Sequence, residues 1–117
     1  MSIPSIPIIQ SAEQLTVILQ KNQNQHQPRT ILWFSAKWCE PCQRMDKPTL
    51  KSEADSLGFP LYYVDIETVP QLAEQFEIKS LPTFVLTNSQ GQVDARRMNA
   101  DTTKICQWMR QLAKQYP

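Results

Sequence analysis

Hydrophobic positions along this chain switch several times between short continuous runs and helical spacing, a pattern typical of alternating strands and helices. It predicts a short strand over residues 7–10 and then a helix that starts at Ser11, with Gln14 completing a capping-box motif. Residues 21–28 are mostly Asn, Gln and His and are expected to form a solvated loop. Residues 30–35 are a largely apolar run between polar segments, which favours a strand buried on both faces.

The middle of the chain continues this alternation. From Cys39 onward the apolar spacing becomes helical, and Gly58 is the expected C-terminal stop of that helix. Residues 60–65 are then expected to form the next strand. Thr68 and Gln71 form a second capping-box pattern, which predicts a further helix.

Two strands and a helix are expected to complete the fold. Residues 83–86 and 92–98 are typical of strands joined by the turn-forming segment 88–91, and residues 101–115 form an amphipathic helix. The expected order is therefore β-α-β-α-β-α-β-β-α. This order predicts an α/β fold in which a central mixed β-sheet is flanked by helices on both faces.

Length and composition limit the class of protein. The 117 residues are expected to form one domain over residues 1–117. Hydrophobic residues make up 41% and charged residues 20% of the chain, as in folded globular domains and unlike disordered chains. Only Gly58 and Gly91 are glycines, which argues against Gly-rich phosphate loops. The net charge of +1 gives no electrostatic reason to expect a nucleic-acid partner.

The N-terminal segment and the cysteines together indicate a compartment. Residues 1–10 contain no Lys or Arg, and prolines interrupt their isoleucines, so no secretory signal is expected. The apolar runs are far shorter than the ~20 residues that span a bilayer, so no membrane partner is expected. Three cysteines, two of them three positions apart, do not make the disulfide framework of a small secreted domain. We therefore expect a cytoplasmic protein.

The segment Trp38-Cys39-Glu40-Pro41-Cys42 lies where a buried strand is expected to lead into a helix. Unpaired N–H groups at a helix N-terminus favour the thiolate of Cys39, which is the form that attacks a disulfide. Cys42 follows one helical turn later and faces Cys39 closely enough to displace a mixed disulfide. Pro41 suits the first turn, where a missing N–H is harmless. The motif predicts a redox-active dithiol.

Residues 31–42 resemble the central strand and active-site turn of the thioredoxin family, and Leu81-Pro82-Thr83 resembles the cis-proline segment of that family. The Gly91 hairpin and the final amphipathic helix follow in the family's order, so the resemblance covers nearly the whole chain. It implies the thioredoxin fold and a cis peptide bond before Pro82. The substrate-binding and site-shaping residues that it implies are Trp38, Glu40, Pro41, Leu81 and Pro82.

The sequence departs from the thioredoxin pattern near the cysteines. Glu40 stands where thioredoxins usually carry Gly, and Trp33 stands where they carry a buried Asp. The Lys that accompanies this Asp corresponds to Tyr63. We expect Trp33 to be an apolar core residue and Cys42 to rely on water or a nearby carboxylate for deprotonation. The motif is similar to those of tryparedoxin- and nucleoredoxin-like proteins, and its Glu-Pro pair to those of TlpA-like reductases.

Glu40 is also expected to influence the redox behaviour of the pair. Its carboxylate disfavours a second negative charge on Cys39, whereas Lys37 and the helix terminus favour that charge. Because exposed charges are screened, the net effect is expected to be small. A less stable thiolate disfavours the reduced state, so we expect a reductant and not a strong oxidant.

A zinc site is the structural alternative for the cysteine pair. Zinc requires four ligands, and the other candidates, Cys106 and His26, are distant in sequence and lie in unlike contexts. We therefore expect no metal. Cys106 is expected to flank the apolar face of the last helix without a further role, and His26 to be a solvated loop residue.

Two classes of function remain open. In the first, a thiol-disulfide oxidoreductase reduces protein disulfides: Cys39 forms a mixed disulfide and Cys42 resolves it. The resemblance implies that no prosthetic cofactor is needed and that a thioredoxin reductase with NADPH, or another dithiol protein, re-reduces the pair. We expect such a protein to be a monomer. In the second class, a thioredoxin-fold adaptor binds its partner through Trp38, Leu81 and Pro82 without redox turnover.

Overall fold

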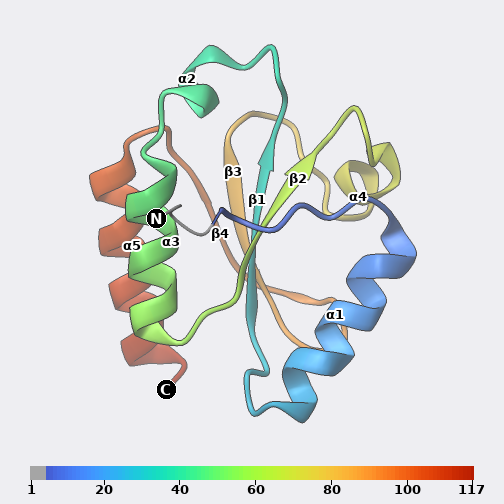
Figure 1. Cartoon of the computed structure of the whole chain (residues 1–117), viewed down its shortest axis with the longest axis vertical. Helices are drawn as coiled ribbons and strands as arrows, with labels where there is room; N and C mark the ends of the chain where they lie inside the picture. Colours follow the sequence, from blue (N-terminus) through green and yellow to red (C-terminus); the bar gives the residue numbers. More distant parts are fainter. Residues whose placement is uncertain (1–4) are drawn as a thin grey trace.

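The computed structural model describes residues 5–117; residues 1–4, on which part of the expectation about a signal segment rests, lie outside the described residues. The central sheet of the described chain has four strands, in the order β2-β1-β3-β4. Strand β1 is parallel to β2 and antiparallel to β3, which is antiparallel to β4. The mixed sheet is therefore confirmed (Figure 1). Its strands are β1 (Thr30–Ser35), β2 (Leu61–Asp65), β3 (Thr83–Thr87) and β4 (Val93–Met98).

Helices cover both faces of this sheet, as expected (Figure 1). Helices α3 (Lys47–Leu57) and α5 (Thr102–Gln115) pack together over one face. Helices α1 (Ala12–Asn24) and α4 (Pro70–Gln75) cover the other face. The short helix α2 (Glu40–Gln43) lies beyond the end of β1.

Strand β1 is buried along its whole length, as its apolar run predicts. Ile31 and Trp33 belong to the core under α3 and α5, whereas Leu32 and Phe34 belong to the core under α1 and α4. Because side chains alternate along a strand, Ser35 lies on the same face of the sheet as Trp33. The buried Ser35 hydroxyl therefore lies at the end of β1, from which the chain continues to α2.

The expected first strand is reduced to a single β-bridge between Ile8 and Tyr63. The Ile9 N–H donates to the Tyr63 carbonyl over 2.9 Å, and the Tyr63 N–H donates to the Pro7 carbonyl over 2.8 Å. Pro7 has no N–H and so cannot supply the next donor of the ladder.

Helix α1 begins where the capping box places it but ends later than expected. The Gln14 N–H donates to the Ser11 hydroxyl over 3.0 Å. The helix continues to Asn24, so the expected loop over residues 21–28 is wrong in its first part. The reason is Asn22, which is buried and donates its amide to the Thr30 hydroxyl over 3.0 Å.

The expected helix from Cys39 to Gly58 is divided into α2 and α3. Asp46 caps α3, because its carboxylate accepts the Thr49 N–H over 3.0 Å. Pro48 lies in the first turn of α3, where no hydrogen bond from its N–H is needed. In the interior of one continuous helix from Cys39 to Gly58, the same proline would remove a backbone hydrogen bond, so α2 and α3 are separate. Gly58 ends α3 in the left-handed conformation, at φ 81°, as expected.

The second capping-box prediction is wrong. Helix α4 begins at Pro70, and its N-cap is Val69, which makes no side-chain capping bond. Proline favours the first helical position because its φ is already helical, so Pro70 and not Thr68 sets this start.

The expectation for Cys106 is also corrected. Its side chain is buried, at 4% exposure, in the core with Ile105 and Met109. It is covered because α3 packs directly along α5.

Candidate active site

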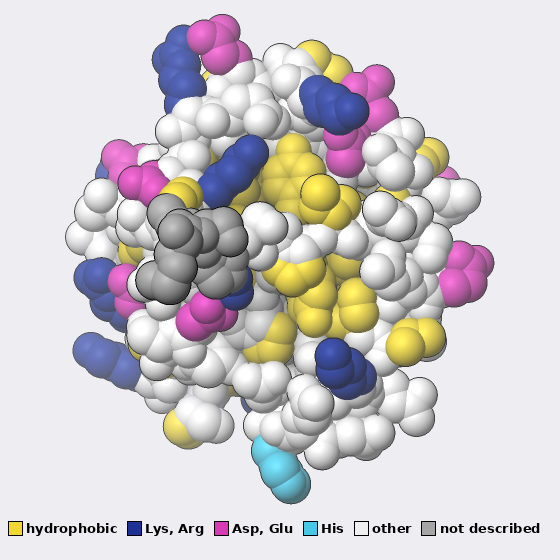
Figure 2. Space-filling view, viewed as in Figure 1, with side chains coloured by type: hydrophobic (Ala, Val, Ile, Leu, Met, Phe, Trp, Pro, Cys, Tyr) yellow, Lys and Arg dark blue, Asp and Glu magenta, His cyan; other side chains and the backbone are white. Residues whose placement is uncertain are grey.

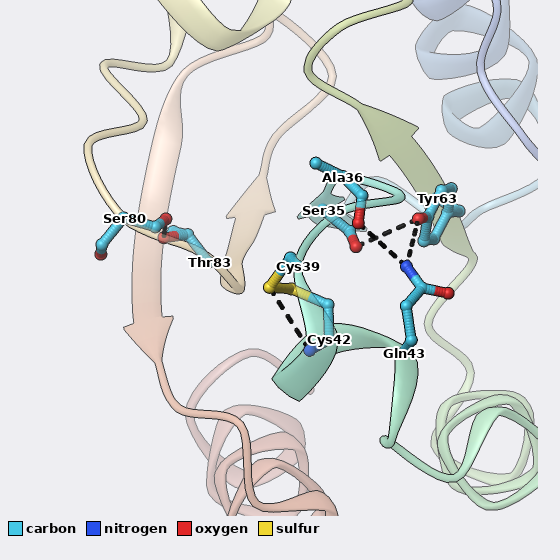
Figure 3. Close-up of a disulfide and its surroundings, with 8 residues drawn as sticks. All are labelled: Ser35, Ala36, Cys39, Cys42, Gln43, Tyr63, Ser80 and Thr83. Carbon is cyan, nitrogen blue, oxygen red and sulfur yellow. Dashed lines mark hydrogen bonds between the residues drawn. A yellow bond between two sulfur atoms is a disulfide. The ribbon is translucent and has the colours of Figure 1, made fainter.

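The Cys39–Cys42 pair lies where the chain leaves β1 and enters α2, and the two sulfurs form a disulfide (Figure 3). Cys39 is the N-cap residue of α2, and Pro41 lies in its first turn. The Cα atoms of the two cysteines are 5.3 Å apart. The local sequence produces this approach, since Pro41 sets a helical φ between two cysteines one turn apart.

Both cysteines of the pair are buried. Cys42 is fully buried and Cys39 is 5% exposed. Ala36 forms a small buried cluster with the two cysteines, and Ile66 and Leu81 pack against it. Cys39 remains the sulfur that faces the surface groove described below.

Hydrogen bonds and charges around Cys39 act in opposite directions. The Cys42 N–H donates to the Cys39 sulfur over 3.4 Å, which favours negative charge there. Glu40 is exposed and forms an ion pair with Arg44, one turn further along the chain. Since Arg44 neutralises part of the Glu40 charge, the repulsion between Glu40 and a Cys39 thiolate is weaker than the sequence alone suggests.

The Leu81–Pro82 peptide bond is cis, as the family resemblance implies. Leu81 packs against the cysteine cluster, whereas Pro82 is buried. The Thr83 hydroxyl donates to the Ser80 carbonyl over 2.7 Å and so fixes the turn before β3. Figure 3 shows Ser80 and Thr83 across the disulfide from Ser35 and Tyr63.

An apolar groove of about 480 Å³ opens beside Cys39. Its apolar wall includes Trp38, which is 65% exposed, and Leu81. Glu40 and Lys79 also line the groove, one with a negative and one with a positive charge. Of the expected site residues, Trp38, Cys39, Glu40, Pro41 and Leu81 thus meet at one groove. Cys42 lies buried beside it, and the roles of all these residues stay predictions.

A polar cluster next to the cysteines was missed by the sequence analysis. The Tyr63 hydroxyl donates to the Ser35 hydroxyl over 3.0 Å, and the Gln43 amide donates to the Tyr63 oxygen over 3.4 Å (Figure 3). The same amide donates to the Ala36 carbonyl over 2.9 Å. A signal existed in the sequence, because Ser35 ends an apolar run and Tyr63 stands where the family carries Lys.

Within residues 5–117, no three His, Cys, Asp or Glu side chains lie close enough together to hold a metal ion. No helix in this range has the length and apolar character that crossing a membrane requires.

A family model described as Thioredoxin matches residues 7–111. The chain is 31% identical to the mitochondrial Thioredoxin O of Oryza sativa subsp. japonica over 113 residues, which cover 95% of this chain and 64% of the rice protein. It is 34% identical to Thioredoxin H2 of Arabidopsis thaliana over 65 residues, which cover 55% of this chain and 48% of that protein. The aligned chain thus spans about half to two thirds of the length of these relatives.

The fold is similar to the solution structure of the oxidised thioredoxin of Plasmodium falciparum, with a TM-score of 0.78. The two chains are 24% identical, and the match covers 93% of this chain and 99% of the other. At 24% identity, this similarity supports the fold alone. Because the family model extends over nearly the whole sequence, from the N-terminal bridge into α5, the chain belongs to the thioredoxin family.

Proposed function

We propose that this chain is a thiol-disulfide oxidoreductase that reduces protein disulfides, with Cys39 as nucleophile and Cys42 as resolving cysteine. The observation that carries the proposal is the disulfide between two cysteines one turn apart, with Cys39 facing an apolar groove. Membership of the thioredoxin family supports the same chemistry.

The reaction proceeds in two exchanges. The Cys39 thiolate attacks one sulfur of the substrate disulfide, so that a Cys39–substrate bond forms, the substrate S–S bond breaks and the other substrate sulfur leaves as a thiolate. The Cys42 thiolate then attacks the Cys39 sulfur and displaces the second substrate thiolate. The substrate gains two electrons, the cysteine pair loses two, and solvent protonates the released thiolates.

Burial supports this division of roles. Cys39 faces the groove, whereas Cys42 is fully buried and lies within bonding distance of the Cys39 sulfur that it attacks. The bond from the Cys42 N–H stabilises a Cys39 thiolate before the attack. Trp38 and Leu81 offer an apolar surface to the chain on either side of the substrate disulfide. The Leu81 backbone is suited to pair with an extended substrate segment as an added strand.

We propose the electron donor that the resemblance to the thioredoxin family implies. A thioredoxin reductase with NADPH, or another dithiol protein, re-reduces the oxidised pair. We also propose that the chain is a monomer and that it works in the cytoplasm. A free, buried thiol at Cys106, in a chain that also carries a reactive pair, suits a reducing compartment. Size-exclusion chromatography and cell fractionation test these two statements.

Reduction of insulin by dithiothreitol, followed by turbidity, tests the activity. The wild-type chain is expected to accelerate the precipitation of insulin, and Cys39→Ser is expected to abolish the acceleration. Cys106→Ser is the matched control, since it removes a sulfur away from the groove and is expected to retain activity. Equal rates with wild type and Cys39→Ser would instead favour an adaptor that binds partners without turnover.

A further inference from the structure

The resolving step places an unusual demand on Cys42. On the proposed function, its thiol must become a thiolate while it is fully buried. An uncompensated charge in such a position is costly, and hydrogen bonds to the charged form are what relieve the cost. Trp33 packs against Tyr63 and Phe84 as a core aromatic residue. Its buried indole N–H has no hydrogen-bond partner among the described residues, and it cannot take up the proton of Cys42 as a carboxylate would.

The polar cluster described above forms a chain of donors with one direction. The Gln43 amide donates to the Tyr63 oxygen over 3.4 Å, and the Tyr63 hydroxyl donates to Ser35 over 3.0 Å. A serine hydroxyl that accepts a bond still has its own proton to donate. The last donor of the chain is therefore the Ser35 hydroxyl, which is completely buried.

Each end of the donor chain is next in sequence to a member of the buried cysteine cluster. Gln43 directly follows Cys42, and Ser35 directly precedes Ala36, which is in the buried cluster of the two cysteines. The Gln43 amide also bonds the Ala36 carbonyl over 2.9 Å and so ties α2 to the end of β1. Figure 3 shows Ser35, Tyr63 and Gln43 grouped next to the disulfide.

We propose that, once the pair is reduced, the Ser35 hydroxyl donates a hydrogen bond to the Cys42 thiolate, with Tyr63 and Gln43 as the positioning residues that orient and polarise it. Each donor in such a chain strengthens the next. The donor chain favours the attacking form of Cys42, and none of its three members carries a charge.

The other end of the donor chain, formed by Gln43 and Tyr63, lies at the surface. Tyr63 and Gln43 line a second hollow of about 460 Å³, so this end of the donor chain is open to water. The donors point toward Cys42 and stabilise its thiolate, and the proton that Cys42 loses goes to water. The charged groups on this hollow are Lys37, Lys47 and Asp65, and the Lys47 ammonium lies 5.8 Å from the centre of the Tyr63 ring. Figure 2 shows hydrophobic side chains gathered in the middle of the face that it views, with Lys or Arg side chains beside them.

The experiment separates the two exchanges in a single turnover. Reduced protein is mixed with 5,5′-dithiobis(2-nitrobenzoate), and release of the coloured thiol is followed by stopped flow. The first release, by Cys39, depends on reagent concentration, whereas the second, by Cys42, is intramolecular and does not. The rate of the second release is recorded against pH.

Tyr63→Phe and Ser35→Ala are expected to slow the second release about tenfold at neutral pH and to move its pH midpoint upward by about one unit, since a bond to a charged group is lost. The first release is expected to be unchanged. Tyr62→Phe is the matched control, because the neighbouring Tyr62 packs against the core on the other face of the sheet. If Ser35→Ala does not fold, Tyr63→Phe decides alone.

The outcomes distinguish this inference from the function on which it rests. A wild-type chain without a second, concentration-independent release would overturn both. A wild-type second release whose midpoint stays the same in the variants would leave the oxidoreductase standing and overturn the donor chain. A purely structural role would lower stability without moving the midpoint, which is also the overturning result.

Discussion

The indole ring of Trp33 and the phenol ring of Tyr63 meet edge to face, with centroids 5.1 Å apart and planes at 85°. These two residues stand where the thioredoxin resemblance has a buried Asp and its Lys partner. Trp33 also stacks on Phe84, at 5.5 Å and 12°, and is fully buried. The prediction that Trp33 is an apolar core residue is confirmed. Aromatic packing thus replaces a charged pair beneath the cysteines.

Trp33→Asp is expected to destabilise the fold by at least about 3–5 kcal/mol, the usual cost of truncating a buried aromatic residue, with a buried carboxylate in addition. Urea unfolding measures the loss. The matched control is Trp38→Asp, which makes the same change at a side chain that is 65% exposed and is expected to cost little. A Trp33→Asp variant that is fully stable and turns over faster would contradict this account.

Glu40→Gln is expected to raise the thiolate fraction of Cys39 and to make the pair more oxidising. The reason is the loss of a negative charge next to the sulfur, and the change is expected to stay under about one pK unit because both Glu40 and Arg44 are exposed. Alkylation rates against pH and the redox equilibrium with glutathione measure the two effects.

Arg44→Gln is expected to act in the opposite direction, because it leaves the Glu40 charge unpaired. Glu13→Gln, which removes a carboxylate from the first turn of α1, is the control for net charge. If the thiol titration is the same in wild type and Glu40→Gln, the carboxylate is only a surface charge.

Cys106 is expected to be inert in the native protein. Burial, and secondarily the negative charge of Glu53, raise the pKa of its thiol, so little thiolate is present at neutral pH. In a Cys39→Ser/Cys42→Ser variant, a thiol reagent is expected to label nothing in buffer and one sulfur in denaturant. Rapid labelling of the folded variant would show that the α3–α5 core opens.

The Glu53–Arg110 ion pair is expected to make stability depend on pH. The Arg110 guanidinium donates to the Glu53 carboxylate over 2.7 Å and holds the pKa of that carboxyl below its ordinary value of 4.5. A lowered folded-state pKa adds stability above the unfolded value, and this stability is lost as the pH falls through the folded value.

Arg110→Gln is therefore expected to lower the midpoint of urea unfolding slightly at pH 7, and the difference from wild type should shrink as the pH falls below 4.5. Lys114→Gln removes the same charge from the same helix and is the control. A difference that stays constant down to acid pH would mean that Arg110 acts through packing and not through its charge.

The sequence by itself was sufficient for the alternation of strands and helices from β2 to α5 and for the position of the cysteine pair. Hydrophobic patterns with a period of 2 residues in strands and 3.6 residues in helices are local. The positions of β1, the β3–β4 hairpin and α5 can therefore be predicted from the residues of each element. The start of α1 after its N-cap Ser11 and the end of α3 before its C-cap Gly58 follow from local capping chemistry. Where two local signals competed, as at Thr68 and Pro70, the sequence alone misplaced the helix start.

The tertiary structure decided what depends on residues that are distant along the chain. Cys39 is buried because Ile66 and Leu81 pack over it, and Cys106 is buried because α3 lies along α5. The donor chain exists because Tyr63 of β2, which is opposite Trp33 in the register, reaches two residues along β1 to Ser35, and because Gln43 of α2 reaches the Tyr63 oxygen. Local sequence patterns do not predict these contacts, because the strand register and the packing between elements set the distances between their side chains.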